Sequence, residues 1–250
     1  GCANPGSEPG SNTITGCTMR SSASNGANSS VYGSDFLLVE FNGAIPASYN
    51  VYFAGFDATN NASNSGVSIH HASGDTKKIS TYTTTTTSRR YYSQLPDNSH
   101  WQVNWAPTFA NYGITEPGSS GAPLFHSNGR IMGKLSGGPS SCGAVAGDKN
   151  DYYGKLSYDW TSNGTAASQR LKPWLDPLNL GSSFVGGRLP CPANCPDIQE
   201  PNNSQATAGT ISTGVYNKAL IAATTDQDYY KFTATTGVNI TVSLTTLPFD

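Results

Sequence analysis

Residues 115–123 read Thr-Glu-Pro-Gly-Ser-Ser-Gly-Ala-Pro, and this stretch is the most informative in the chain. Gly118 can take backbone angles that are closed to other residues, Gly121 leaves room beside Ser120, and Pro123 suits the first residue of a strand. Two interpretations stay open from these residues alone. The segment is either an ordinary Gly/Ser turn between strands, or a tight turn that projects the Ser120 hydroxyl while the N–H groups of Gly118 and Ser120 converge on one point.

The composition favours an all-β protein of an oxidising compartment. The chain has 250 residues, of which 12% are charged, and a formal net charge of −2. It therefore has no excess of positive charge that would attract nucleic acid. No apolar run approaches the ~20 residues of a membrane helix. Short β-branched and aromatic runs alternate with Gly, Asn and Pro turns, whereas the helical period is scarce. We therefore expect a secreted all-β protein with no nucleic-acid partner and no membrane span.

The five cysteines fit secretion but do not pair evenly. Cys191 and Cys195 enclose a short loop and can bridge locally. Cys2, Cys17 and Cys142 leave one thiol over, which indicates a partner residue outside the chain. The first residues show neither an initiating Met nor the regions of a signal peptide. We expect that the chain begins in mid-protein.

Strand-like runs are expected along most of the first 185 residues, with residues 1–30 as loop. The runs are 36–41, 49–53, 67–71, 78–82, 101–105, 123–125 and 131–135. The threonine tract 83–87 is either an edge strand or a loop. Asn128-Gly129 predicts a tight hairpin turn with positive φ angles. A single helix is expected near residues 165–172, ended by Pro173.

The amino-acid composition of the chain changes after residue 185. Residues 186–199 are rich in Gly and Pro and predict a linker. Beyond them, Glu-Pro-Asn-Asn-Ser at 200–204 and Asp-Gln-Asp-Tyr-Tyr-Lys-Phe at 226–232 resemble the bacterial pre-peptidase C-terminal domain, a small β-sandwich. The resemblance implies a truncated sandwich over 200–250, and such an open sandwich would expose unpaired strand edges.

A serine nucleophile needs a base and a group that orients the base. Asp35 stands at the start of the apolar run 36–41, where it is either a turn residue or such an orienting carboxylate. No histidine precedes Asp35, and a structural or surface role is favoured for each of the four that follow it. These are His70, His71, His100 and His126.

Five segments, in this order and spacing, resemble the bacterial lysyl endopeptidases, which are secreted relatives of trypsin. They are Ser-Asp-Phe-Leu-Leu-Val-Glu-Phe (34–41), Gly-Val-Ser-Ile-His-His-Ala-Ser-Gly-Asp (66–75), Thr-Glu-Pro-Gly-Ser-Ser-Gly-Ala-Pro (115–123), Gly-Gly-Pro-Ser-Ser-Cys (137–142) and Trp-Leu-Asp-Pro (174–177). The likeness covers about residues 1–186. It implies a trypsin-like double β-barrel over 1–185 whose first barrel is incomplete.

The resemblance also implies the roles of the residues around the serine turn. Ser120 is the nucleophile, Asp35 orients the catalytic histidine, and the N–H groups of Gly118 and Ser120 form the oxyanion hole. In the family that histidine lies in a Thr-Ala-His-Cys-like segment upstream of everything in this chain. The disulfides of the family would join Cys142 and Cys2 to cysteines outside the chain, and Cys17 has no assigned partner.

The specificity of the family points to a second carboxylate. Trypsin places this aspartate six residues before the nucleophile, where the present chain has Ile114. The alternative in the family is an aspartate in a later loop, and Asp151 matches it. Such a carboxylate pairs with a basic substrate side chain, which is costly to desolvate alone. Ser136, Gly137 and Gly138 match the strand that pairs with the substrate backbone.

The chain departs from the lysine-specific members at two places. Those members carry His where Ser136 stands and Trp near Tyr91 or Tyr92. A basic preference is therefore implied, but an exclusive preference for lysine is not. Ser136 is the residue type that trypsin has there, and it can hydrogen-bond Asp35.

Taken together, the sequence predicts part of a secreted bacterial serine endopeptidase, a monomer that cleaves protein or peptide substrates after Lys or Arg through an acyl-enzyme. No metal or organic cofactor is implied. The chain itself is predicted to be inactive because it lacks the base. Two alternatives stay open, namely a pseudoprotease that keeps a peptide groove and a carbohydrate- or surface-binding β protein that uses its Thr- and Tyr-rich face.

Overall fold

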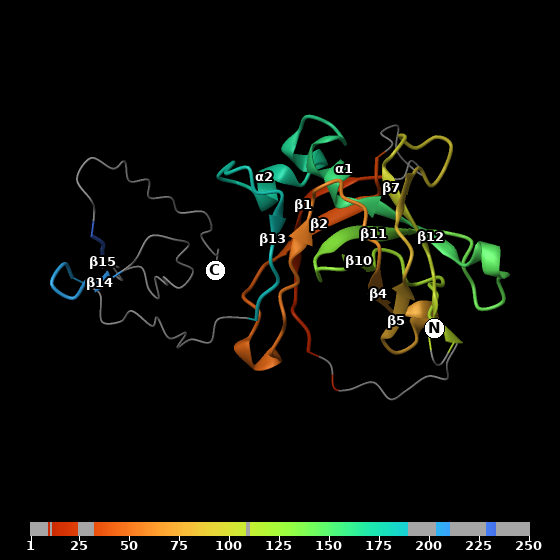
Figure 1. Ribbon diagram of the computed structural model, residues 1–250, viewed down its shortest axis with the longest axis horizontal. Coiled ribbons are helices and arrows are strands. Elements are labelled where there is room, and N and C mark those ends of the chain that lie inside the picture. Colours follow the sequence, from red (N-terminus) through yellow and green to blue (C-terminus); the bar gives the residue numbers. More distant parts are fainter. Residues whose placement is uncertain are drawn as a thin grey trace. The chain divides into compact units, whose positions relative to one another are not determined.

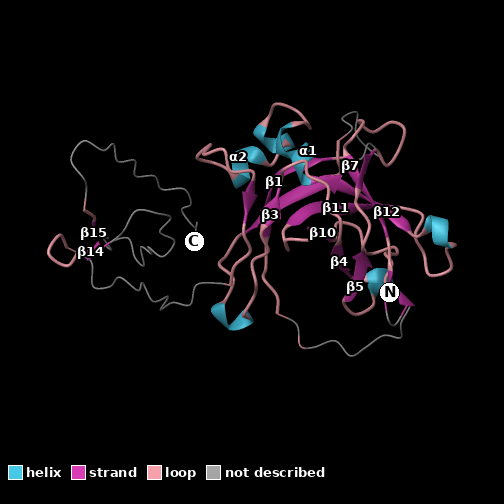
Figure 2. Cartoon of the chain, in the orientation of Figure 1, coloured by secondary structure: helices cyan, strands magenta, loops and turns pink. Residues whose placement is uncertain are grey.

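The computed structural model describes residues 10, 12–24, 33–108, 111–189, 204–210 and 229–233. The chain divides into two compact units, Gly1–Leu189 and Pro190–Asp250. The described part of the first unit is mostly β with a few short helices (Figures 1 and 2), which confirms the expected β character at that level. Among the described residues, no helix is long and apolar enough to cross a membrane.

One nine-stranded sheet organises the first unit. Its strands lie in the order β5-β4-β10-β11-β12-β7-β6, while β3 attaches to β11 and β13 attaches to β3. The bounds are β3 Phe56–Asp57, β4 Gly66–His70, β5 Lys78–Tyr82, β6 Thr87–Arg89, β7 His100–Asn104, β10 Pro123–His126, β11 Ile131–Gly137, β12 Asn150–Lys155 and β13 Phe184–Val185. The main path is antiparallel throughout. Figure 1 shows β10, β11 and β12 side by side at its centre.

The main core is built from side chains that alternate along these strands. Trp101 and Val103 of β7 point into it two residues apart, as the pleat requires. Leu124 of β10 and Tyr153 of β12 have no exposed surface, and burial of such side chains contributes roughly 1.5–3 kcal/mol each. Ile114 belongs to the same core, so the position where trypsin has its specificity carboxylate is apolar here.

A second apolar cluster fixes the segment around Asp35. It joins a two-stranded antiparallel hairpin to two short helices. These elements are β1 Cys17–Ala23, β2 Phe36–Phe41, α1 Leu156–Thr161 and α2 Lys172–Leu175. Phe36, the neighbour of Asp35, is buried in this cluster with Leu156. The start of β2 is therefore held by packing.

Two expectations about strands and loops in the first unit are wrong, and one alternative is resolved. Residues 17–23 form β1 rather than loop, because pairing with β2 satisfies their backbone groups. The run 49–53 is not a strand, since Tyr49 ends the 3₁₀ turn Ala47–Tyr49 and Phe53 makes an isolated bridge to Arg188. The threonine tract is loop until Thr87, where β6 begins.

The expected helix over 165–172 is replaced by a 3₁₀ turn, Ala167–Gln169, and by α2. Arg170 between them is extended, with φ −148° and ψ 158°. Pro173 lies in the first turn of α2, where its missing N–H would have had no acceptor inside the helix. Pro173 therefore lies at the start of a helix, whereas the sequence pattern predicted a helix that ends before this proline.

The hairpin between β10 and β11 closes with the His126 N–H donating to Arg130 O at 2.8 Å. Gly129 has φ +81° and donates to His126 O at 2.8 Å, whereas Asn128 is not left-handed. The expected positive φ therefore applies to glycine alone. This is the three-residue loop in which the last residue takes the left-handed conformation.

The described part of the second unit contains one parallel pair, β14 Gly209–Thr210 with β15 Tyr230–Lys231. Most of the predicted linker 186–199 and sandwich 200–250 lies outside the described residues, so these domain assignments stay predictions. Cys17 is free and exposed. Cys142 takes part in a disulfide with another cysteine of this chain, so the expectation that its partner lies outside the chain is wrong. Cys2, Cys191 and Cys195 lie outside the described residues.

Candidate active site

The segment 115–123 is a tight turn that leads into β10. Gly118 has φ +94° and Gly121 has φ +82°, so both take the left-handed conformation that favours glycine. Ser119 is buried between them, whereas Ser120 is exposed. The turn therefore directs one serine into the protein and presents the other at the surface.

Only alternate N–H groups of residues 118–121 in this turn donate hydrogen bonds within the described part of the chain. Those of Ser119 and Gly121 donate to backbone oxygens at 3.0 and 2.8 Å. Those of Gly118 and Ser120 have no acceptor within the described part of the chain. Two free donors on either side of a buried serine are the arrangement that could bind one oxyanion.

A buried histidine holds the inward serine of the turn. His70, the last residue of β4, lies with its Nδ1 2.9 Å from Ser119 Oγ and its Nε2 2.7 Å from Ser80 Oγ in β5. Burial lowers the pKa of His70 to about 4, so the ring is neutral at physiological pH. The turn is thus attached to two strands of the sheet through Ser119.

Asp35 lies in the connection to β2 with φ +61°, a conformation that Asp tolerates better than most residues. Burial raises the pKa of Asp35, while the nearby Ser136 hydroxyl and the positive charge of Lys134 act in the opposite direction. The hydrogen bond between Ser136 and Asp35 that the sequence suggested stays a prediction.

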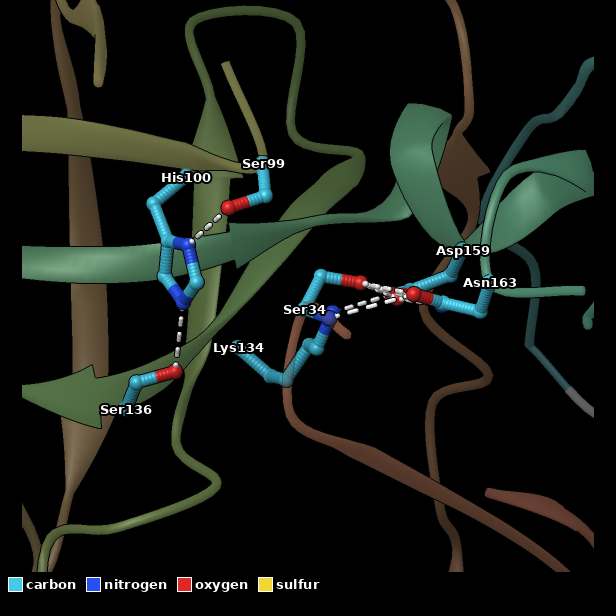
Figure 3. Close-up of polar contacts among 7 residues, drawn as sticks. All are labelled: Ser34, Ser99, His100, Lys134, Ser136, Asp159 and Asn163. Carbon is cyan, nitrogen blue, oxygen red and sulfur yellow. Dashed lines mark hydrogen bonds and ion pairs between the residues drawn. The ribbon is translucent and has the colours of Figure 1, made fainter. Parts of the chain in front are cut away.

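A buried ion pair lies next to Asp35. Lys134 of β11 contacts Asp159 of α1, which has no exposed surface. Asn163 donates from Nδ2 to Asp159 Oδ1 at 3.0 Å and accepts from the Ser34 N–H at 3.2 Å, and Ser34 Oγ donates to Asp159 (Figure 3). The residue that precedes Asp35 is therefore fixed on both its backbone and its side chain.

Strand β11 passes both the serine turn and Asp35. Leu135 exchanges backbone hydrogen bonds with Gly121 and Ala122 at 2.8 and 2.9 Å. Its neighbours Lys134 and Ser136 both lower the pKa of Asp35. The turn of Ser120 and Asp35 thus lie near successive residues of a single strand.

Asp151 of β12 is buried with no exposed surface. Its Oδ2 accepts from Trp105 Nε1, Thr115 Oγ1 and Ser140 Oγ, each at 2.6 Å. Its Oδ1 has no hydrogen-bond partner among the described residues. Burial raises the pKa of Asp151, and the three donors, together with the Ser140 backbone, lower it. A carboxylate with one oxygen fully satisfied and the other unpaired is suited to a cationic ligand.

Gly138 lies directly against that free oxygen. A Cβ at Gly138 would lie 2.3 Å from Asp151 Oδ1, and one at Gly137 would lie 2.7 Å from the Tyr91 hydroxyl. Gly137 also has φ +145°. Side chains at 137 and 138 would therefore displace the groups that the structure places there.

None of the four histidines hydrogen-bonds Ser120 or Asp35. His70 and His100 each contact two serines, His71 Nδ1 lies 3.0 Å from Asp75 O, and His126 Nδ1 lies 3.2 Å from Ser127 Oγ. The structural roles expected from the sequence fit these contacts. A base for Ser120 would have to come from another residue.

The sequence missed the buried groups that support the site. His70 and His100 occupy strand positions, and one serine partner of each, Ser119 and Ser136, lies 49 and 36 residues away, which no local motif encodes. The Lys134–Asp159 pair was missed for the same reason. Among the described residues, no group of three or more His, Cys, Asp or Glu side chains could hold a metal ion.

These features place the chain among the β-rich relatives of serine proteases. The family described as lysyl endopeptidase, C-terminal domain, matches residues 2–154. The match covers more than half of the chain, so the chain belongs to this family, as the sequence resemblance predicted.

A curated relative and a solved structure are also similar to the chain. Lysyl endopeptidase of Pseudomonas aeruginosa is 34% identical over 128 residues, which are 49% of this chain and 26% of the relative. The match thus spans about a quarter of the relative's length. The crystal structure of Rv3671c from M. tuberculosis H37Rv, an inactive form, is 15% identical with a TM-score of 0.30 and covers 49% of this chain and 53% of that one. This structural likeness is too low to carry an argument.

Proposed function

We propose that the protein containing this chain is a secreted bacterial serine endopeptidase with a trypsin-like double β-barrel, which cleaves peptide bonds after Lys or Arg. The observation that carries the proposal is the buried, unpaired Oδ1 of Asp151 beside Gly138. A buried carboxylate oxygen that accepts no hydrogen bond is unfavourable in the free protein. The cationic side chain of a bound substrate would supply the missing partner of Asp151 Oδ1.

The chemistry follows from the serine turn. The Ser120 oxygen attacks the carbonyl carbon of the scissile bond, and its proton passes to a histidine base that donates it to the leaving amine. The N–H groups of Gly118 and Ser120 stabilise the oxyanion of the tetrahedral intermediate. Water then attacks the acyl-enzyme, and the carboxyl product and the free Ser120 hydroxyl are released.

The base is assigned to a histidine outside this chain, because the four histidines present make other contacts. Asp35 would receive the Nδ1–H of that histidine and hold the ring toward Ser120. Ser136, Gly137 and Gly138 would pair with the backbone of the substrate next to the scissile bond. The substrate side chain would then extend past Gly138 to Asp151.

Cleavage of a peptide library by the full-length protein tests the proposal. We expect cleavage after Lys and Arg in the wild type, and loss of that preference in Asp151→Asn, which removes the negative charge and keeps the shape. Asp148→Asn is the matched control, because Asp148 is an exposed aspartate three positions away. A basic preference that survived Asp151→Asn would refute the assignment of Asp151.

A further inference from the structure

The Gly118 N–H lies on the central peptide group of a β-turn. Residues 116–119 form this turn, which is closed by the Ser119 N–H donating to Glu116 O at 3.0 Å. Pro117 and Gly118 occupy the two central positions, and Gly118 has φ +94°. Proline at the second position followed by a positive φ at the third identifies a type II turn.

The orientation of this central peptide decides whether the Gly118 N–H can bind an oxyanion. Turns of types I and II have the same corner positions and differ mainly by a rotation of the central peptide of about 150–170°. Because the peptide is planar and trans, its C=O and its N–H point in opposite directions. The rotated form would therefore bring Pro117 O to the side on which Gly118 now presents its N–H. An oxyanion would then meet an acceptor instead of a donor.

The loop that joins β4 to β5, residues 71–77, contacts this peptide from one side (Figure 1). The Ser73 N–H of the loop donates to Pro117 O at 2.8 Å. A Cβ at Gly118 would lie 3.3 Å from His71 O, so the loop and the turn are in close contact. The hydrogen bond exists only while the Pro117 carbonyl faces the loop, and the Gly118 N–H then points away from the loop.

Ser73 makes this contact from an unfavourable backbone conformation. Its φ is +54° inside the 3₁₀ turn Ala72–Gly74, a region that residues other than glycine rarely adopt. The loop keeps this conformation because Ala72 is buried, the Asp75 N–H donates to Ala72 O at 3.0 Å, and Lys78 pairs with Asp75 at 2.8 Å. Backbone strain that the surrounding structure maintains is frequent at functional sites.

We propose that Ser73 is a positioning residue for the oxyanion site, because its backbone N–H holds the peptide between Pro117 and Gly118 in the orientation that frees the Gly118 N–H. Proline and glycine at the centre of the turn already favour type II, and the hydrogen bond adds to that preference. The β4–β5 loop thereby sets the fraction of molecules in which the Gly118 donor is available. The catalytic significance of this role rests on the proposed function, whereas the orientation of the peptide does not.

The hydrogen bond can be tested without enzymatic activity. We expect the Ser73 amide of the full-length protein, followed by NMR after ¹⁵N-serine labelling, to exchange with solvent at least about ten-fold more slowly than in an unfolded peptide. Ser73 is exposed, so slow exchange would report the hydrogen bond rather than burial of the residue. Exchange at the unprotected rate would overturn the proposal.

Deletion of this single donor tests its effect on the turn. Replacement of Ser73 by its α-hydroxy analogue puts an ester oxygen in place of the N–H and keeps the side chain. We expect the Gly118 amide resonance to shift and kcat for peptide cleavage to fall about two- to ten-fold, the worth of one neutral hydrogen bond, with little change in KM. Complete loss of an oxyanion donor, about 10²–10³-fold in kcat, is the upper limit. An unchanged kcat in the folded ester protein would refute the positioning role.

Two substitutions that remove the same hydroxyl separate the backbone conformation from the side-chain contact. The Ser73 hydroxyl donates to Glu116 Oε2 at 3.3 Å, and Ser73→Gly and Ser73→Val both lose this contact. Glycine accepts a positive φ and should keep most of kcat. Valine, which is β-branched, disfavours it and should lower kcat to about the level of the ester protein, again with little change in KM. Equal kcat values in the two folded variants would contradict the proposal, and if Ser73→Val does not fold, the ester protein decides.

Asn50→Val is the matched control for this comparison. Asn50 is also exposed and has φ +46°, but it lies at the end of the 3₁₀ turn Ala47–Tyr49. We expect it to lose stability and to keep kcat. An equal loss of kcat in Asn50→Val and Ser73→Val would mean that general destabilisation is the cause, and would overturn the proposal.

Failure of this inference can be told apart from failure of the proposed function. No peptide cleavage by the wild-type full-length protein would refute the proposed function. The exchange rate of the Ser73 amide and the Gly118 resonance would still decide whether Ser73 holds the turn. Normal cleavage by the wild type and by the ester protein would refute the role of Ser73 alone.

Discussion

Two buried histidines of the sheet make similar contacts in different surroundings. His70 lies between Ser80 and Ser119 beneath the serine turn, and His100 lies between Ser99 and Ser136. Each ring contacts two hydroxyl groups, and burial lowers the pKa of each. The two groups look alike in composition and in burial.

The difference lies in what surrounds each group. His70 holds Ser119, whose Oγ also accepts from the Glu116 N–H at 3.4 Å, so these contacts fix the serine turn. His100 lies near the positive charges of Lys134 and Lys155, which lower its pKa further. His70 therefore supports the turn, whereas His100 lies where a further positive charge is disfavoured.

The largest contrast is expected between the two serines of the turn. Ser120→Ala should lower turnover of the full-length protein about a million-fold, because the nucleophile is lost. Its free energy of unfolding should change by less than about 0.5 kcal/mol, because Ser120 is exposed. Ser119→Ala keeps the nucleophile but leaves a His70 nitrogen unpaired, so it should cost about 1–3 kcal/mol of stability. Peptide cleavage and urea unfolding measure both. Equal losses of activity would mean that the assignment of Ser120 is wrong.

The region beneath Asp35 also contains a charge pair, and removing one member should be costly. Lys134→Met leaves Asp159 buried and unpaired and should lower the free energy of unfolding by about 3–5 kcal/mol. Arg20→Met is the matched control, because it breaks the exposed Arg20–Glu40 pair of the β1–β2 hairpin and should cost less than about 1 kcal/mol. Urea unfolding of both variants gives the values. Similar losses in the two would show that burial does not distinguish the pairs.

A paired substitution compares the hydroxyl partners of the two histidines. Ser80→Ala and Ser99→Ala each remove a hydroxyl from one histidine and should each cost about 1–3 kcal/mol of stability. Urea unfolding of both variants is the measurement. An unchanged free energy of unfolding in either variant would show that its histidine does not need that hydroxyl.

The smallest expected effect is the pH dependence of stability. The pKa values of His70 and His100, about 4 and about 3, lie below the ordinary value of 6.5. The unfolded chain therefore binds more protons at intermediate pH, and the free energy of unfolding should fall as the pH drops from 6.5 toward 4.

Buried carboxyl groups with raised pKa values, such as Asp35 and Asp151, act with the opposite sign. The test is therefore the difference between the wild type and His70→Gln in urea unfolding at several pH values. The variant should show the shallower fall below pH 6.5. Parallel curves would mean that His70 takes up a proton in the folded protein as readily as in the unfolded chain.

Local chemistry explains what the sequence could predict. The glycines and serines of 115–123 specify a turn by themselves. The structure gives Gly118 the special backbone angles that the sequence suggested, and Gly121 also has a positive φ. Asp35 and Asp151 were singled out by their place in matched segments, and their roles in a reaction stay proposals.

Long-range packing explains what the sequence could not predict. Ser136 meets His100 because β11, β12 and β7 pair in one particular register, and a motif of a few residues contains no register. The helix near 165–172 was misplaced for a related reason. Leu171 is buried in the second apolar cluster, and its N–H donates to Asp159 O at 2.9 Å, so tertiary contacts overrode the local pattern.

The surface hairpin 127–129 has a consequence for the whole site. The length of this loop sets the register of β11, and so determines which residues of the strand lie beside the serine turn, Asp35 and Asp151. Successive residues of a strand face opposite sides of the sheet. One residue more or less in that loop would bring the wrong side chain to all three places together. Surface loops usually accept insertions, but the length of this loop determines which residues of β11 lie at the site. Variation is better tolerated in loops that do not lead into β11.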